Sequence, residues 1–316
     1  MPSDYEHAVE IAERRQEIGE PALRRLVTES RQEPTLGSYL VRLAAADALR
    51  GEGAADEQRC RELVEAFEEW AKGLPPGERE EAAAVTHLAE VEFGRRPDFW
   101  SDTRPDTLGH GVPQASFRKG LRATAVPAEG PSHATIIVHG TWAHTGDPPR
   151  WYQPGGGFYE FVRKHEADSS HVMDFWWSGK NTDGARHDAV VAFAEFVHEL
   201  QADEISVIAH SHGVNVALDA TDVELRYTRT VALSAPFREA FAPDDPTRVG
   251  ALYNIQAEVD FVVAFARGTR NPSYPVPELY EYIELEGEHR HSRSHDVDVW
   301  EKFALGPTTG LWPKPE

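Results

Sequence analysis

The chain has 316 residues, 40% of them hydrophobic, and carries a formal net charge of −21 at pH 7. Eight tryptophans and fourteen phenylalanines supply enough apolar surface for a packed core, which excludes a disordered chain. The acidic excess argues against nucleic acid and anionic membrane surfaces as partners, because both bind clustered lysine and arginine. No run approaches the roughly 18 apolar residues of a membrane span, so no span is expected.

Two features of the chain indicate a reducing compartment. The first residues, MPSDYEHAVEIAERRQEI, lack the basic segment followed by an apolar segment that a secretory signal requires. The single cysteine, Cys60, cannot form an intramolecular disulfide. Both features predict a cytoplasmic protein.

Residues 1–98 are predicted to form a small all-α domain. Apolar residues recur there at spacings of three and four, and no alternating run of β-branched residues appears. Pro21 suits a first helical turn, and Gly51, Gly73 and Gly94 suit helix ends. The expected helices cover residues 4–18, 21–30, 36–50, 55–73 and 78–94. Binding of a protein partner is one hypothesis for this domain.

Residues 99–121, rich in proline, glycine and turn residues, are the expected linker to a second domain at 122–316. In that second domain, short β-rich runs alternate with helical stretches. The runs lie at 134–140, 171–177, 205–209, 230–235, 252–257 and 280–285, with 122–127 as a candidate edge strand. Continuous apolar strands separated by helices predict an α/β fold: a mostly parallel sheet with helices on both faces and ligands at the carboxyl ends of the strands.

The segment ISVIAHSHGVNVALDA at 205–220 carries the strongest functional signal. A strand that turns sharply into a helix exposes one serine above the sheet, provided that the residues two places before and after it are small. Ala209 and Gly213 meet this requirement around Ser211. Backbone N–H groups at the start of the helix suit a developing oxyanion. The pattern therefore predicts Ser211 as a nucleophile.

An earlier strand, within ATIIVHGTWA at 134–143, runs into His139 and Gly140. The segments VHGTWA and AHSHG together resemble the α/β-hydrolase superfamily, in particular its lipase- and esterase-like members. The resemblance covers roughly residues 122–316 and implies an α/β-hydrolase fold. It also implies that the residue after HG and the residue after the nucleophile, Thr141 and His212, donate backbone N–H groups to the oxyanion. His139 is then a structural residue of the loop.

The acid of a serine triad is expected between the nucleophile and the histidine along the chain. The strand within ALYNIQAEVDFVV at 251–263 leaves Glu258 and Asp260 at its carboxyl end. Small lipase-like hydrolases have a similar aspartate just ahead of a Val-Val pair, so the resemblance selects Asp260. Other acids nearby, expected to be caps or surface groups, are Asp244, Asp245 and Asp298.

The segment GEHRHSRSHDVDVW at 287–300 offers three histidines in one loop, His289, His291 and His295. By resemblance, the base lies a few residues after a strand-ending glycine and about nine before an apolar helix anchor. Gly287 and Trp300 then select His291 as the base, with His295 as the alternative. A zinc site made of the three histidines is disfavoured, because no H-E-x-x-H motif accompanies them.

Ser211, His291 and Asp260 predict a serine hydrolase that cleaves a carboxylic ester, or a related acyl bond, of a small-molecule substrate through an acyl-enzyme, with no metal or cofactor. Thioesterase and acyltransferase chemistry on the same triad remain open, because they share its tetrahedral intermediate. An interaction or effector module that uses the hydrolase fold as a scaffold is an alternative of another class. The aromatic loop at 144–161, which carries Trp151 and Tyr152, is expected beside the oxyanion loop.

Overall fold

The computed structural model describes residues 11, 20–28, 36–48, 62–63, 65–67, 69–73, 131–141, 149–165, 170–179, 183–223, 225–258, 260, 262–263, 268–288 and 290–312. The chain divides into two compact units. The first comprises Met1–Phe99 together with Ala257–Gly268 and Gly287–His291, and the second comprises Trp100–Gln256, Thr269–Glu286 and Ser292–Glu316.

Helices α2 (Glu20–Thr28) and α3 (Leu36–Ala48) of the first unit pack against each other. They match two of the expected helices, with Pro21 in the first turn. The described residues at 62–71 are also helical, and the ring of Tyr39 lies 5.4 Å from Phe67 and 5.0 Å from Trp70. The expected helices at 4–18 and 78–94 lie outside the described residues, apart from Ile11, as does Cys60. The domain boundaries at 98 and 121 stay predictions.

The second unit is built on a six-stranded sheet in the order β2-β1-β3-β4-β5-β6. The strands are β1 (His133–Val138), β2 (Ser170–Phe175), β3 (Glu204–His210), β4 (Arg229–Leu233), β5 (Ala251–Ala257) and β6 (Leu279–Leu285). Pairing is parallel between β1 and β2, β1 and β3, β3 and β4, and β4 and β5. All six β-rich runs are therefore strands, and the mostly parallel sheet is confirmed. The candidate edge strand at 122–127 lies outside the described residues.

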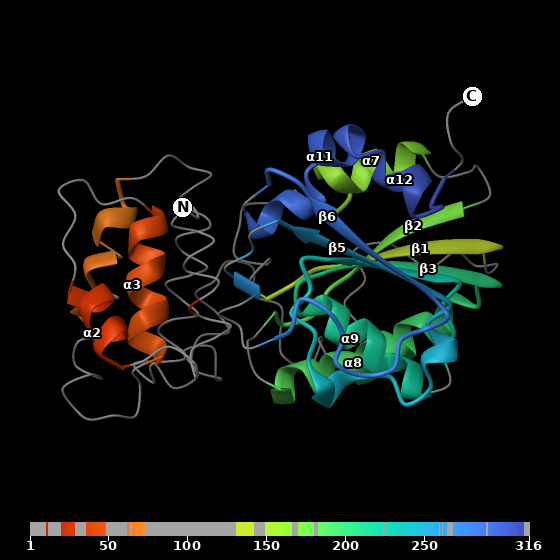
Figure 1. Ribbon diagram of the computed structural model, residues 1–316. Helices are drawn as coiled ribbons and strands as arrows, with labels where there is room; N and C mark the ends of the chain where they lie inside the picture. Colours follow the sequence, from red (N-terminus) through yellow and green to blue (C-terminus); the bar gives the residue numbers. More distant parts are fainter. Residues whose placement is uncertain are drawn as a thin grey trace. The chain divides into compact units, whose positions relative to one another are not determined.

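Helices cover both faces of this sheet, as predicted (Figure 1). One face carries α8 (Asp183–Leu200) and α9 (Gly213–Asp219), and the other carries α7 (Gly157–His165), α11 (Val297–Lys302) and α12 (Leu305–Thr308). Successive residues of a strand point to opposite faces. Accordingly Ile136 and Val138 of β1 join the core under α8 and α9, whereas Ile137 joins the core under α7 and α11.

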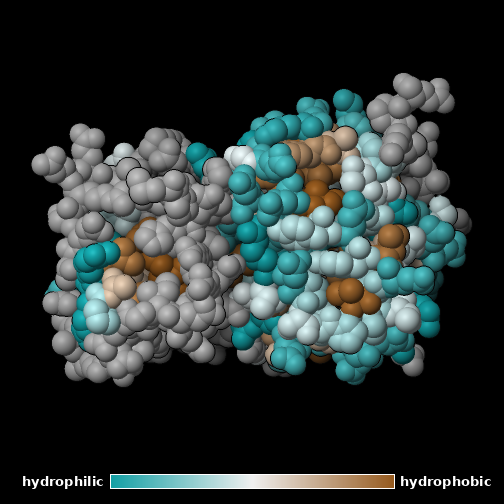
Figure 2. Space-filling model, in the orientation of Figure 1, coloured by the Kyte–Doolittle hydropathy of each residue, from teal (hydrophilic) through white to brown (hydrophobic). Residues whose placement is uncertain are grey.

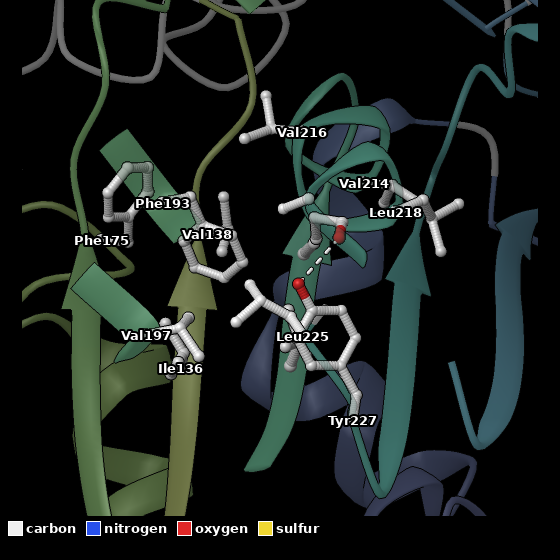
Figure 3. Close-up of a cluster of buried hydrophobic side chains, with 14 of the residues drawn as sticks. Ile136, Val138, Phe175, Phe193, Val197, Val214, Val216, Leu218, Leu225 and Tyr227 are labelled. Atoms are coloured by element: carbon white, nitrogen blue, oxygen red, sulfur yellow. Dashed lines mark hydrogen bonds between the residues drawn. The ribbon is translucent and has the colours of Figure 1, made fainter. Parts of the chain in front are cut away.

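The core between β1–β3 and helices α8 and α9 is shown in Figure 3. Phe175 of β2 packs edge-on against Phe193 of α8, with the ring centroids 4.8 Å apart. Tyr227, which precedes β4, donates a hydrogen bond from its hydroxyl to the carbonyl oxygen of Ala217 at 2.9 Å. Apolar packing and this hydrogen bond fix α9 on the sheet, directly after the predicted nucleophile.

Short 3₁₀ helices complete the second unit: η1 (Ala220–Val223), η2 (Glu239–Phe241) and η3 (Pro246–Arg248). A further one, η4 (His291–His295), starts at the last residue of the first unit's segment Gly287–His291. The connection between β4 and β5 holds only η2 and η3, so no lid domain is inserted there. Figure 2 shows mostly hydrophilic residues on one face of the described part of this unit, with separate hydrophobic patches. Of the described helices, none combines the length and the apolar composition needed to cross a bilayer.

Candidate active site

Ser211 occupies the turn between β3, which ends at His210, and α9, which begins at Gly213. Its φ of +53° lies in the left-handed region, which costs a residue other than glycine about 1–3 kcal/mol. The backbone N–H of Ser211 donates to the carbonyl oxygen of Leu233 at 2.8 Å, so β4 holds the turn in place. The strained serine between a strand and a helix is the local geometry that the sequence predicts.

The loop after β1 lies directly against this turn. A Cβ atom added to Gly140 would lie 2.6 Å from Cβ of Ser211, and one added to Gly213 would lie 2.4 Å from the carbonyl oxygen of His139. Both distances are shorter than real Cβ contacts. Glycine at these two positions lets the loop and the turn touch.

The two residues predicted to donate backbone N–H groups, Thr141 and His212, flank this contact. Thr141 follows Gly140 in the chain and His212 follows Ser211, and consecutive Cα atoms are about 3.8 Å apart. The hydroxyl of Thr141 is buried without a hydrogen-bond partner among the described residues. His212 is only 3% exposed. The role of both backbone amides as oxyanion donors stays a prediction.

His139 has a structural environment. Its Nε2 accepts the backbone N–H of Trp177 at 3.2 Å, which requires the proton on Nδ1, and that nitrogen donates to the carbonyl oxygen of Gly140 at 2.7 Å. The indole N–H of Trp177 donates to the carbonyl oxygen of His139 at 2.8 Å. These bonds end β1 at Val138, so His139 and Gly140 lie in the loop rather than in the strand run predicted at 134–140.

Trp151, in the aromatic loop, lies beside the turn that carries Ser211. Its ring stacks on that of His295 with centroids 4.1 Å apart and planes 3° from parallel, and it meets His210 edge-on at 5.6 Å. Tyr152 packs against His139 at 4.6 Å, and burial raises the pKa of its hydroxyl to about 12. The aromatic loop, as far as it is described, therefore borders the turn that carries Ser211.

Asp260 and His291, which belong to the first unit, form a hydrogen-bonded pair. The Nδ1 atom of His291 lies 2.9 Å from Oδ2 and 3.1 Å from Oδ1 of Asp260. Asp260 is fully buried, and its Oδ1 also accepts the backbone N–H of Val263 at 3.0 Å. The structure thus brings together the acid and the histidine that the resemblance selects.

The other candidates for the acid and for the base have different contacts. Glu258 accepts the backbone N–H of Gly287 at 2.6 Å, where φ is +77°. The Nδ1 atom of His295 lies 3.8 Å from Asp296, beyond hydrogen-bonding distance. His289 lies outside the described residues. Within those residues, no group of three or more histidine, cysteine, aspartate or glutamate side chains could hold a metal ion.

The remaining acids behave largely as surface groups. Asp245 caps η3 by accepting the backbone N–H of Thr247 at 3.0 Å. The hydrogen bond from the Thr247 hydroxyl, together with this backbone bond, holds the pKa of Asp245 below its usual range. Asp298 pairs with Arg293 at 2.8 Å, which lowers its pKa.

Sequence reasoning missed Asn215. This residue is fully buried on α9 and contacts the ring of His212. Its signal in the sequence is an amide side chain, four residues after the predicted nucleophile, within the otherwise apolar run GVNVAL. A buried amide needs hydrogen-bond partners, so its presence there points to a polar contact.

No protein-family model matches the chain, and no curated protein matches its sequence. Solved structures are similar at low identity. A serine hydrolase homologue from Coxiella burnetii is 17% identical with a TM-score of 0.38, covering 57% of this chain and 86% of its own. The carboxylesterase EstE1, cloned from a metagenomic library, is 14% identical with a TM-score of 0.38, covering 58% and 80%. An acetylxylan esterase is 11% identical with a TM-score of 0.36, covering 58% and 98%.

The fold follows from this chain's own geometry. The sheet has the order β2-β1-β3-β4-β5-β6, with helices on both faces. A strained serine joins the central strand β3 to α9, and a His-Gly loop lies against it. A strand, a strained serine and a helix in this order form the nucleophile elbow of α/β hydrolases. The chain has the α/β-hydrolase fold.

Proposed function

We propose that the protein is a serine hydrolase that cleaves a carboxylic ester of a small-molecule acyl substrate, with Ser211 as the nucleophile. The observation that carries this proposal is the strained turn at Ser211, with φ of +53° and the loop after β1 against its side chain. Backbone strain of this kind persists only where the surrounding structure imposes it, and it is concentrated at functional sites.

The hydrogen-bonded Asp260–His291 pair supports the same assignment. An ionised carboxylate can only accept, so Nδ1 of His291 donates to Asp260. The neutral imidazole then presents Nε2 as its basic nitrogen, which is the tautomer that a general base for a serine hydroxyl needs. In the proposed reaction Asp260 orients His291, and His291 receives the proton of Ser211.

The reaction has two steps. Oγ of Ser211 attacks the ester carbonyl while His291 takes its proton, and the backbone N–H groups of Thr141 and His212 stabilise the oxyanion. His291 then protonates the leaving alcohol, which departs and leaves an acyl group on Ser211. Water, deprotonated by His291, attacks the acyl carbonyl. Collapse of the second intermediate returns the proton to Ser211 and releases the carboxylic acid.

A fluorophosphonate probe, which phosphonylates activated serines, tests this proposal on the full chain. Labelling of the unmodified protein and loss of labelling in Ser211→Ala are expected, together with hydrolysis of p-nitrophenyl esters that survives treatment with a chelator. A protein that does not label under conditions in which a known serine esterase labels would refute the proposal. Loss of esterase activity on chelation would favour a metal-dependent hydrolase instead.

A further inference from the structure

The orientation of the Asn215 side-chain amide is determined by two backbone groups. Its Nδ2 lies 3.0 Å from the carbonyl oxygen of Pro236, and its Oδ1 lies 3.2 Å from the backbone N–H of Arg238. A carbonyl can only accept and an N–H can only donate, so the amide nitrogen faces Pro236 and the amide oxygen faces Arg238. Both partners lie in the segment that follows β4.

This orientation fixes the proton on the neighbouring imidazole. The second hydrogen of Nδ2 of Asn215 points to Nδ1 of His212, at 3.1 Å. Because Nδ2 donates, Nδ1 of His212 must accept, and the ring carries its proton on Nε2. A proton on Nδ1 would put two N–H groups face to face in a place where Asn215 is fully buried and His212 is 3% exposed.

His212 follows Ser211 directly in the chain, so its imidazole is a further candidate to receive the serine proton. We propose that Asn215 is a positioning residue that occupies the basic nitrogen of His212 and holds this ring in the neutral Nε2–H form. His212 then contributes its backbone N–H to the site and takes no part in proton transfer. The inference rests on the proposed function, because it assigns proton transfer at Ser211 to one imidazole, that of His291.

A parallel arrangement exists on the other side of the turn. The Nε2 atom of His139 accepts from Trp177, and its Nδ1 donates to Gly140, so its basic nitrogen is also occupied. Other titratable or charged groups that contacts or sequence put near α9 include His210, Arg238 and Tyr227, whose hydroxyl donates to Ala217. At the end of the helix lie Asp222 and the pair of Asp219 with His187 at 3.4 Å.

Asn215→Asp tests the inference, because the carboxylate has nearly the same shape but can only accept. It keeps the bond from Arg238, loses the bond to Pro236, and allows Nδ1 of His212 to become a donor. The full-length protein is labelled with ¹⁵N, and the ring nitrogens of His212 are assigned by comparison with His212→Gln. In the unmodified protein we expect a protonated Nε2 and an unprotonated Nδ1 from about pH 5.5 to about pH 9. In Asn215→Asp we expect both ring nitrogens of His212 to carry protons at the acidic end of this pH range.

The pH dependence of kcat/KM for a p-nitrophenyl ester gives a second readout. Asn215→Asp is expected to add one ionisation to the profile, and Asn215→Asp combined with His212→Gln is expected to lose it again. Asp219→Asn is the matched control, because it also changes the charge of α9 by one but leaves the contact with His212 intact. It should leave the His212 nitrogens unchanged.

Two results would overturn the inference. One is a proton on Nδ1 of His212 in the unmodified protein, a result that needs no variant to fold. The other is an Asn215→Asp protein whose His212 nitrogens and pH profile match those of the unmodified protein. The nitrogen measurement does not depend on activity. A protein that fails to react with the fluorophosphonate but shows the expected tautomer refutes the proposed function alone.

Discussion

Nδ1 of His291 donates to both carboxylate oxygens of Asp260, at 2.9 Å to Oδ2 and 3.1 Å to Oδ1. The carboxylate is fully buried, and the backbone N–H of Val263 gives it a further donor. The side chain of His291 is 12% exposed. Since the carboxylate holds Nδ1, the pair leaves Nε2 as the basic nitrogen of the ring, which leads to the first prediction.

Asp260→Asn is expected to slow fluorophosphonate labelling of Ser211 by about 10³–10⁴-fold, because an amide stabilises the wrong tautomer of His291. Glu258→Gln is the matched control. Its carboxylate accepts the backbone N–H of Gly287, a bond that the amide oxygen of glutamine can keep, so labelling should stay within about twofold of the unmodified protein. The second-order rate of labelling is the measurement. An equal loss in both variants would contradict the role of Asp260.

The two described candidate bases are separated by a second pair of variants. His291→Ala should abolish labelling, whereas His295→Phe should keep it, because a phenyl ring preserves the stack on Trp151. Thermal unfolding of both variants shows whether they are folded. The reverse pattern, with labelling lost only in His295→Phe, would make His295 the base.

The strain at Ser211 predicts a difference between two inactive variants. Both Ser211→Gly and Ser211→Ala lack the nucleophile and should fail to label. Only glycine adopts φ of +53° without steric cost, so Ser211→Gly should be about 1 kcal/mol more stable than Ser211→Ala. Urea unfolding measures the difference. Equal stabilities would mean that the turn is not strained.

The contact between Gly213 and the loop after β1 predicts that a larger residue at this position lowers the stability of the protein. Gly213→Ala places a Cβ 2.4 Å from the carbonyl oxygen of His139, so either the loop or the turn must shift. We expect a loss of about 1–3 kcal/mol in the free energy of unfolding, together with slower labelling.

Gly184→Ala is the control for this substitution, because a Cβ there meets nothing within 4 Å in α8. It should be neutral or stabilising by up to about 1 kcal/mol, since alanine is the better helix former. A Gly213→Ala protein as stable and as reactive as Gly184→Ala would show that the close approach is not required.

Tyr227 gives the protein a pH dependence at alkaline pH. Burial raises the pKa of its hydroxyl above the usual value, while in the unfolded chain this pKa is about 10. Above that pH the unfolded state binds fewer protons than the folded state, so the stability that this residue contributes is lost as the pH rises.

Tyr227→Phe should cost about 1 kcal/mol at neutral pH, because the hydrogen bond to Ala217 is lost. The difference from the unmodified protein should shrink between about pH 9 and about pH 11, because the variant lacks this ionisation. Urea unfolding at several pH values measures it. A difference that stays constant over this range would contradict the buried, protonated phenol.

Local sequence was enough to predict the strands and the turn at Ser211. A parallel strand covered on both faces must be apolar throughout, and a sharp turn after it requires small residues such as Gly213, so both leave a mark in a few consecutive residues. The ends of the strands were predicted less accurately. The run predicted at 134–140 ends at Val138, because Trp177, far along the chain, takes up the hydrogen-bonding groups of His139.

Contacts between distant residues were decided only by the tertiary structure. Composition and spacing left three histidines open, and the pairing of His291 with Asp260, 31 residues away, emerges only when the two segments fold together. The link from Asn215 through Pro236 to the proton position on His212 has no counterpart in a sequence pattern. The sequence by itself determined the sheet and its strained serine, since those depend on backbone preferences of neighbouring residues. The tertiary structure decided which nitrogen of each ring carries a proton, because hydrogen-bond partners are brought together by packing.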